Sequence, residues 1–239
     1  MPDKTPRNRF TSRSQAVARF IAQRGILKGV VWGMEKVTVV DRQKLKGVKR
    51  PFVVIANHSS HLDAPLIMGA LPRPLARYLA AGAAGDYFFD VWWRRGLTAL
   101  FFNAFPVDRS RRNQRNFNAR MLLQHDVPVL LFPEGTRSKD GQLGHFKPGG
   151  AALASATGVP VLPVAIIGAH QAHPRGSSWP KMGVPLGVVF GAPMRANDGE
   201  KPNEFMARVR DVIAGMMEKH SARILGTKSL ERNSEGEVS

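Results

Sequence analysis

A histidine and an aspartate, His58 and Asp63, are spaced so that they could act together as an acid–base pair. They stand in the segment Asn57-His58-Ser59-Ser60-His61-Leu62-Asp63. A histidine is largely neutral near neutral pH and can take a proton from a hydroxyl group as that hydroxyl attacks. A neighbouring carboxylate fixes the tautomer of the ring and stabilises the imidazolium that forms. The pair therefore predicts general-base catalysis, although the same residues could merely cap a strand end and a first helical turn.

The elements around this pair predict how it is positioned. Residues 52–56 are rich in β-branched side chains and end at Asn57, which is typical of a buried strand that runs into a loop, and a helix is expected at 63–71. Similar apolar runs follow at 127–132, 159–168 and 187–190, with helical segments at 113–124, 149–157 and 203–221. Strands that alternate with helices indicate an α/β fold with a largely parallel central sheet covered by helices. Active residues would then gather at the carboxyl edge of the sheet.

Composition divides the chain into three parts. Residues 1–50 are expected to be a basic N-terminal helical segment at a membrane surface, with an amphipathic helix from about Ser14. The alternatives for the first 24 residues are a basic solvated arm or a first helix packed on the domain. Residues 51–226 would form the catalytic domain, and residues 227–239 a polar tail.

Net charge limits the classes of partner. Lys and Arg number 35 against 18 Asp and Glu, which gives +17 and an attraction for polyanions. The basic residues are dispersed and no known nucleic-acid motif is present, so a nucleic-acid partner is not expected. The absence of cysteine excludes disulfides, a thiolate nucleophile and cysteine-ligated metal.

Four ordered segments resemble the glycerolipid acyltransferase family, the 1-acylglycerol-3-phosphate acyltransferases. The first is the His-x4-Asp word at His58 and Asp63, and the most specific is Phe132-Pro133-Glu134-Gly135-Thr136-Arg137. Phe105-Pro106-Val107-Asp108-Arg109 lies between them, and residues 159–164 follow. The resemblance covers roughly residues 53–164. It implies transfer of a fatty acyl group from a thioester to the free hydroxyl of lysophosphatidic acid.

The resemblance also implies which residues bind the acceptor. It assigns that role to Asp108, Arg109, Glu134, Gly135, Thr136 and Arg137, and by a weaker match to Lys147. Arginine can donate two parallel hydrogen bonds to a phosphate, and lysine supplies a point charge. We interpret Glu134 as a ligand of glycerol hydroxyls or a partner that orients Arg137. Thr136, where relatives acting on glycerol 3-phosphate often have glycine, favours lysophosphatidic acid.

The partners expected are an acyl donor and a membrane. The donor would be acyl-CoA or an acyl carrier protein, and the reaction needs no metal and no cofactor. The stretch Gly25–Val40 is interrupted by charges and suits a membrane interface better than a crossing. Residues 82–100 are an aromatic-rich candidate for membrane contact, with core packing as the alternative. We therefore expect a cytoplasmic protein, peripheral on the inner face of the cell membrane, and the sequence leaves its oligomeric state open.

Four other interpretations stay open at this point. His58 and His61 could share a metal, although a strand-to-helix turn with two histidines needs a further ligand. The pair could activate water in a hydrolase, or the chain could be an inactive basic membrane-binding module. The acceptor could also be another lysophospholipid or lipid alcohol.

Overall fold

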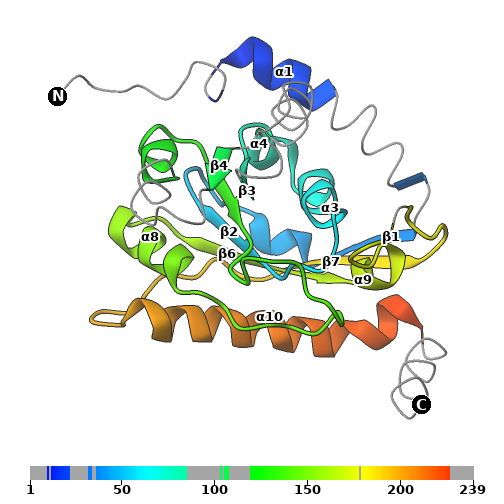
Figure 1. Cartoon of the computed structure of the whole chain (residues 1–239). Coiled ribbons are helices and arrows are strands. Elements are labelled where there is room, and N and C mark those ends of the chain that lie inside the picture. Colours follow the sequence, from blue (N-terminus) through cyan, green and yellow to red (C-terminus); the bar gives the residue numbers. More distant parts are fainter. Residues whose placement is uncertain are drawn as a thin grey trace.

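Within the residues that the structure describes, seven strands form one sheet in the order β1-β7-β6-β2-β5-β3-β4 (Figure 1). The computed structural model describes residues 10, 12–21, 32–33, 36–84, 103, 105–107, 119–177 and 179–226. The strands are β1 (Lys36–Val40), β2 (Val53–Ala56), β3 (Ala80–Ala84), β4 (Phe105–Val107), β5 (Val129–Leu131), β6 (Val161–Ile167) and β7 (Pro185–Phe190). Every pairing is parallel except that of β6 with β7. The expected largely parallel α/β sheet is thus confirmed.

Helices cover both faces of the sheet because both faces of its central strands are apolar. Val53 and Ile55 of β2 point into one core, and Val54 and Ala56 point into the other. A strand alternates its side chains between the two faces, so a continuous apolar run is what a strand covered on both sides requires.

The helices divide between these two faces. α8 (Gly149–Thr157) and α10 (Pro202–Leu225) pack on one, and α3 (Asp63–Ala70) and α4 (Arg73–Ala76) on the other (Figure 1). The remaining helical elements are α1 (Arg13–Ile21), the short 3-10 helix η2 (Arg42–Leu45), a turn of helix at 119–124 and α9 (Ala169–Ala172). α10 buries one side chain per turn along its length, from Phe205 to Ile224. That spacing is the apolar stripe of a helix lying along a sheet.

Three strands were missed at the sequence level. β3 reads Ala-Ala-Gly-Ala-Ala and carries no β-branched residue, and β4 is three residues long. Residues 36–40, predicted to lie at a membrane interface, form β1, which pairs with β7 and buries Val40. The sheet therefore takes strands from both sides of residue 50, where the sequence predicted the boundary between the N-terminal segment and the catalytic domain.

The structure describes part of the segments that were expected to contact a membrane. α1 lies within the basic N-terminal segment, and Val17 and Ile21 are exposed on it. In the part of the chain that the structure describes, no helix combines the length and apolarity needed to cross a bilayer. Of the aromatic-rich stretch 82–100, residues 85–100 lie outside the described residues, as does the tail 227–239.

Gly168 closes β6 in a conformation that only glycine adopts easily. Its φ is +83°, and a Cβ there would collide with the backbone carbonyl of Pro185. We predict that Gly168→Ala lowers the free energy of unfolding by at least about 3 kcal/mol, because backbone strain and the collision add.

Gly158→Ala is the matched control for this change. Gly158 also has a positive φ, +66°, but no atom lies near its would-be Cβ. The control should lose about 1 kcal/mol, the cost of the left-handed backbone alone. Urea unfolding measures both variants, and equal losses would show that the Pro185 contact is unimportant.

Candidate active site

The first part of the site is set by Asn57, which ends β2. Its side-chain amide donates to the carbonyl of Ile166 at 2.9 Å, and its carbonyl oxygen accepts the N–H of Ile166 at 2.7 Å. The buried Asn57 side chain thus makes the two hydrogen bonds to Ile166 that the backbone of a further β2 residue would otherwise make. The main chain is freed to turn at that point, so His58 leaves the sheet at its carboxyl edge.

Asp63 is the polar centre of the turn that follows. Its Oδ2 lies 2.8 Å from His58 Nδ1, and it accepts the backbone N–H groups of Ser59 at 2.7 Å and Ser60 at 2.9 Å. The side chain is fully buried at the first position of α3. A negative charge is favourable at a helix N-terminus, and two backbone donors hold it there. The predicted meeting of His58 and Asp63 is therefore present in the structure.

This arrangement fixes the tautomer of His58. A carboxylate can only accept hydrogen bonds, so Nδ1 must carry the proton that it shares with Asp63. The other ring nitrogen, Nε2, then has a free lone pair in the neutral ring. The His58 side chain is 22% exposed, and its ring stacks on Phe132 with the centroids 4.1 Å apart. The ring is thus held on two sides and left open to accept a proton at Nε2.

The loop after β5 is tied to His58 through Glu134. One oxygen of that carboxylate accepts the backbone N–H of His58 at 2.9 Å, and the other accepts the N–H of Gly144 at 3.4 Å. The carbonyl of His58 in turn accepts the N–H of Ser138 at 2.8 Å. Burial raises the pKa of Glu134, although both backbone donors oppose that rise. We interpreted Glu134 as a ligand of glycerol hydroxyls or a partner of Arg137, but the structure gives both of its oxygens to backbone groups.

Arg210 of α10 binds the segment that contains Gly144, the second donor to Glu134. Arg210 donates from Nε to the carbonyl of Gly144 at 2.9 Å and from a terminal nitrogen to that of Leu143 at 3.1 Å. The residue that donates to Glu134 is therefore itself held by a helix on the far side of the loop. Sequence reasoning missed Asn57, Phe132, Ser138 and Arg210 as supports of the site. All four act through backbone groups or ring stacking, and for Arg210 no motif marks the role.

Two positive side chains that the sequence assigns to the acceptor lie in the loop between β5 and α8. Gly135 has φ +78°, and a Cβ there would come within 2.8 Å of Lys147 Nζ, so the lysine ammonium lies against the Gly135 backbone. Thr136 is exposed and Arg137 half-buried in the same loop. Five of the predicted substrate residues, Glu134, Gly135, Thr136, Arg137 and Lys147, thus share one loop region. Asp108 and Arg109 lie outside the described residues.

His61 faces a second histidine, His173. Burial, followed by the positive charge of Arg137 and the neighbouring His173 and His58, lowers its pKa to about 4. Its ring lies 5.9 Å from that of His173, centroid to centroid. Among the described residues, no three His, Asp or Glu side chains are grouped so that they could hold a metal ion.

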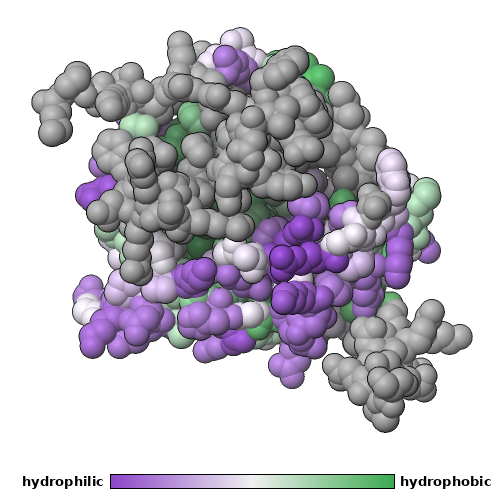
Figure 2. Space-filling model, viewed as in Figure 1, coloured by the Kyte–Doolittle hydropathy of each residue, from purple (hydrophilic) through white to green (hydrophobic). Residues whose placement is uncertain are grey.

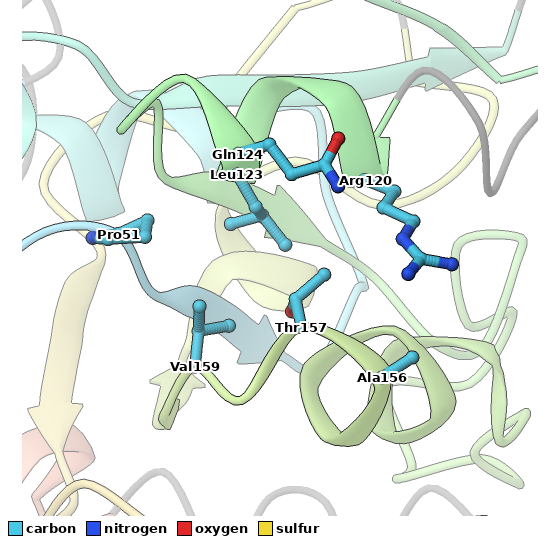
Figure 3. Close-up of a pocket in the computed structure, with 7 residues that line it drawn as sticks. All are labelled: Pro51, Arg120, Leu123, Gln124, Ala156, Thr157 and Val159. Atoms are coloured by element: carbon cyan, nitrogen blue, oxygen red, sulfur yellow. The ribbon is translucent and has the colours of Figure 1, made fainter.

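The cavity in Figure 3 is at the opposite edge of the sheet from this site. It has a volume of about 210 Å³ and is lined by Pro51, Arg120, Leu123, Gln124, Ala156, Thr157 and Val159. Pro51 and Val159 precede the parallel strands β2 and β6, whereas His58 follows β2. This cavity therefore has no part in the chemistry of His58.

Comparison with known proteins gives one family model and several relatives. The acyltransferase family model matches residues 35–167. A 1-acyl-sn-glycerol-3-phosphate acyltransferase of Pseudomonas aeruginosa is 30% identical over 197 residues, which are 77% of this chain and 70% of that protein. One of Chlamydomonas reinhardtii is 34% identical over 59% of this chain and 41% of its own length. The chain spans about half the length of several relatives that it matches.

A solved structure agrees with these matches. The crystal structure of the 1-acyl-sn-glycerophosphate (LPA) acyltransferase PlsC from Thermotoga maritima superposes with a TM-score of 0.67 and 28% sequence identity. The superposition covers 88% of this chain and 84% of that chain.

The Glu134 connection gives a first prediction for the site. Glu134→Ala leaves the N–H groups of His58 and Gly144 without their acceptor, which should lower the free energy of unfolding by about 1.5 to 3 kcal/mol. Glu134→Gln keeps one carbonyl oxygen for the His58 N–H and should lose less. Chemical unfolding of the two variants measures this difference, and an alanine variant as stable as wild type would contradict the role assigned to this carboxylate.

Proposed function

Because the chain belongs to the acyltransferase family, we propose that it moves a fatty acyl group from an acyl thioester to the free sn-2 hydroxyl of lysophosphatidic acid. The product is phosphatidic acid. The observation that carries this proposal is the 2.8 Å hydrogen bond between His58 Nδ1 and the buried carboxylate of Asp63. The two relatives described above are 1-acyl-sn-glycerol-3-phosphate acyltransferases, which supports the choice of acceptor.

The reaction needs one base and no covalent enzyme intermediate. Nε2 of His58 takes the proton of the acceptor hydroxyl as its oxygen attacks the thioester carbonyl, because a neutral hydroxyl is a poor nucleophile. A carbon–oxygen bond forms, the carbon–sulfur bond breaks, and the imidazolium returns its proton to the leaving thiolate. Asp63 stabilises the imidazolium between these two steps.

The acceptor phosphate would be bound by the loop that follows β5. Arg137 and Lys147 are the two cations of this loop that we assign to the phosphate, and Gly135 lets the chain approach the ligand closely. Arg109 and Asp108 are proposed to complete the subsite, with Thr136 beside them. Glu134 would act here by holding the backbone of His58 in place.

The donor and the location are part of the same proposal. The donor would be acyl-CoA or an acyl carrier protein, both of which suit a chain with net charge +17. The lipid acceptor places the reaction at the inner face of the cell membrane, with the protein attached peripherally. The chain requires no cofactor for this chemistry.

Release of free thiol from oleoyl-CoA, with and without lysophosphatidic acid, tests the function. We expect release to depend on the acceptor, with phosphatidic acid as product, and His58→Ala to lose at least about 10³-fold in kcat. Thiol release without an acceptor would indicate a hydrolase. No release with oleoyl-CoA or an acyl carrier protein, over a panel of lysophospholipids, would contradict the proposal and favour a binding module.

Asp63→Asn separates the charge of the carboxylate from its shape. The amide oxygen can keep the donors of Oδ2, while the amide nitrogen takes the place of Oδ1, which is buried without a partner among the described residues. We expect kcat to fall about 10³-fold because the imidazolium loses its counter-charge, with a much smaller change in KM.

Asp126→Asn is the matched control for this charge change. Asp126 pairs with Arg50 at the opposite edge of the sheet, so this variant should keep the kcat of wild type. Equal effects of the two substitutions would argue against a specific role for Asp63.

A further inference from the structure

The loop between α9 and β7 presents apolar side chains to solvent. Residues 174–184, here called the Trp179 loop, carry Trp179, which is 82% exposed, and Met182, which is 72% exposed. Exposed apolar surface rimmed by polar residues is typical of sites that bind proteins, membranes or ligands. Only α1 also exposes large apolar side chains among the described residues.

The charges of this loop are all positive. Arg175 and Lys181 are exposed on either side of Trp179. The chain carries no acidic residue between Asp140 and Asp198, so nothing in the loop's own sequence compensates for these cations. Tryptophan favours the boundary between lipid and water, and arginine and lysine bind the phosphates found there.

Hydrogen bonds hold the loop in this exposed shape. The backbone N–H of Ser177 donates to Pro174 at 3.2 Å, and the Ser177 hydroxyl donates to the carbonyl of Trp179 at 2.9 Å. The N–H of Lys181 donates to Ala172 at 2.7 Å and closes the base. Residues on both sides of Trp179, Ser177 and Lys181, are thus held by hydrogen bonds.

The loop also lies on the catalytic edge of the sheet. β6 runs parallel to β2, so the segment that follows β6 is at the same edge as His58, where Figure 1 draws the yellow loop beside α9. At its base, buried His173 faces His61, three residues beyond His58. In the view of Figure 1, hydrophilic residues gather on the lower half of the visible face (Figure 2).

We propose that the Trp179 loop docks on an anionic lipid bilayer, with Trp179 and Met182 in the interface and Arg175 and Lys181 on lipid phosphates. This inference rests on the proposed function and names the surface by which the site meets its lipid. Docking by this loop turns the carboxyl edge of the sheet towards the membrane. A lipid acceptor then reaches His58 with its acyl chain still in the bilayer.

Binding to phosphatidylglycerol vesicles tests the loop without relying on catalysis. The difference in tryptophan fluorescence between the wild type and Trp179→Phe is the emission of Trp179. We expect this emission to shift to the blue when vesicles are added and to be quenched by brominated lipid. The double variant Arg175→Gln and Lys181→Gln should bind the vesicles about 25-fold more weakly, about fivefold per charge. Arg120→Gln, an exposed charge at the opposite edge, is the matched control and should bind like wild type.

Activity provides the second readout. With lysophosphatidic acid presented in vesicles, Trp179→Ala should raise the apparent KM, and with a short-chain, water-soluble acceptor it should leave kcat/KM unchanged. The proposal would be overturned if vesicles did not change the emission of Trp179, or if Trp179→Ala lowered kcat/KM equally with both acceptors. Self-association of the protein through the loop would also overturn it. If the wild-type protein transfers no acyl group, the vesicle measurements still decide the docking surface, so the two proposals fail separately.

Discussion

One carboxylate oxygen, Oδ2 of Asp63, organises the site. It lies 2.8 Å from the Nδ1 of His58 and accepts the backbone N–H groups of Ser59 and Ser60. An ionised group buried in this way is tolerable only with several donors around it, and the N-terminus of α3 adds a favourable field. The same hydrogen bonds that stabilise the carboxylate also fix the backbone of the loop and the tautomer of His58.

The sheet supplies the second constraint, because it brings three chain segments to one edge. β2, β5 and β6 are parallel neighbours, so the residues that follow β5 and β6 lie at the same edge of the sheet as His58. Glu134 and Ser138 bind the backbone of His58 from the β5 loop, and Arg210 braces that loop from α10. A change in any one of these supports would move the base relative to the loop proposed to bind the acceptor phosphate.

Much of this architecture could be predicted from the sequence, and the exceptions have physical reasons. The buried central strands, α8 with its exact bounds and the pairing of His58 with Asp63 follow from apolar runs, breakers and a short spacing. β3 could not be found because its alanines carry no strand preference. The family resemblance implies an acceptor-binding role for Glu134, whereas its partners in the structure are backbone groups 76 and 10 residues away in sequence. Such contacts depend on tertiary structure and leave no local pattern.

Nitrogen-15 NMR of the His58 ring tests the central claim most directly. We predict that the neutral ring carries its proton on Nδ1, the atom hydrogen-bonded to Asp63. A proton on Nε2 in the neutral ring would contradict this account of the site.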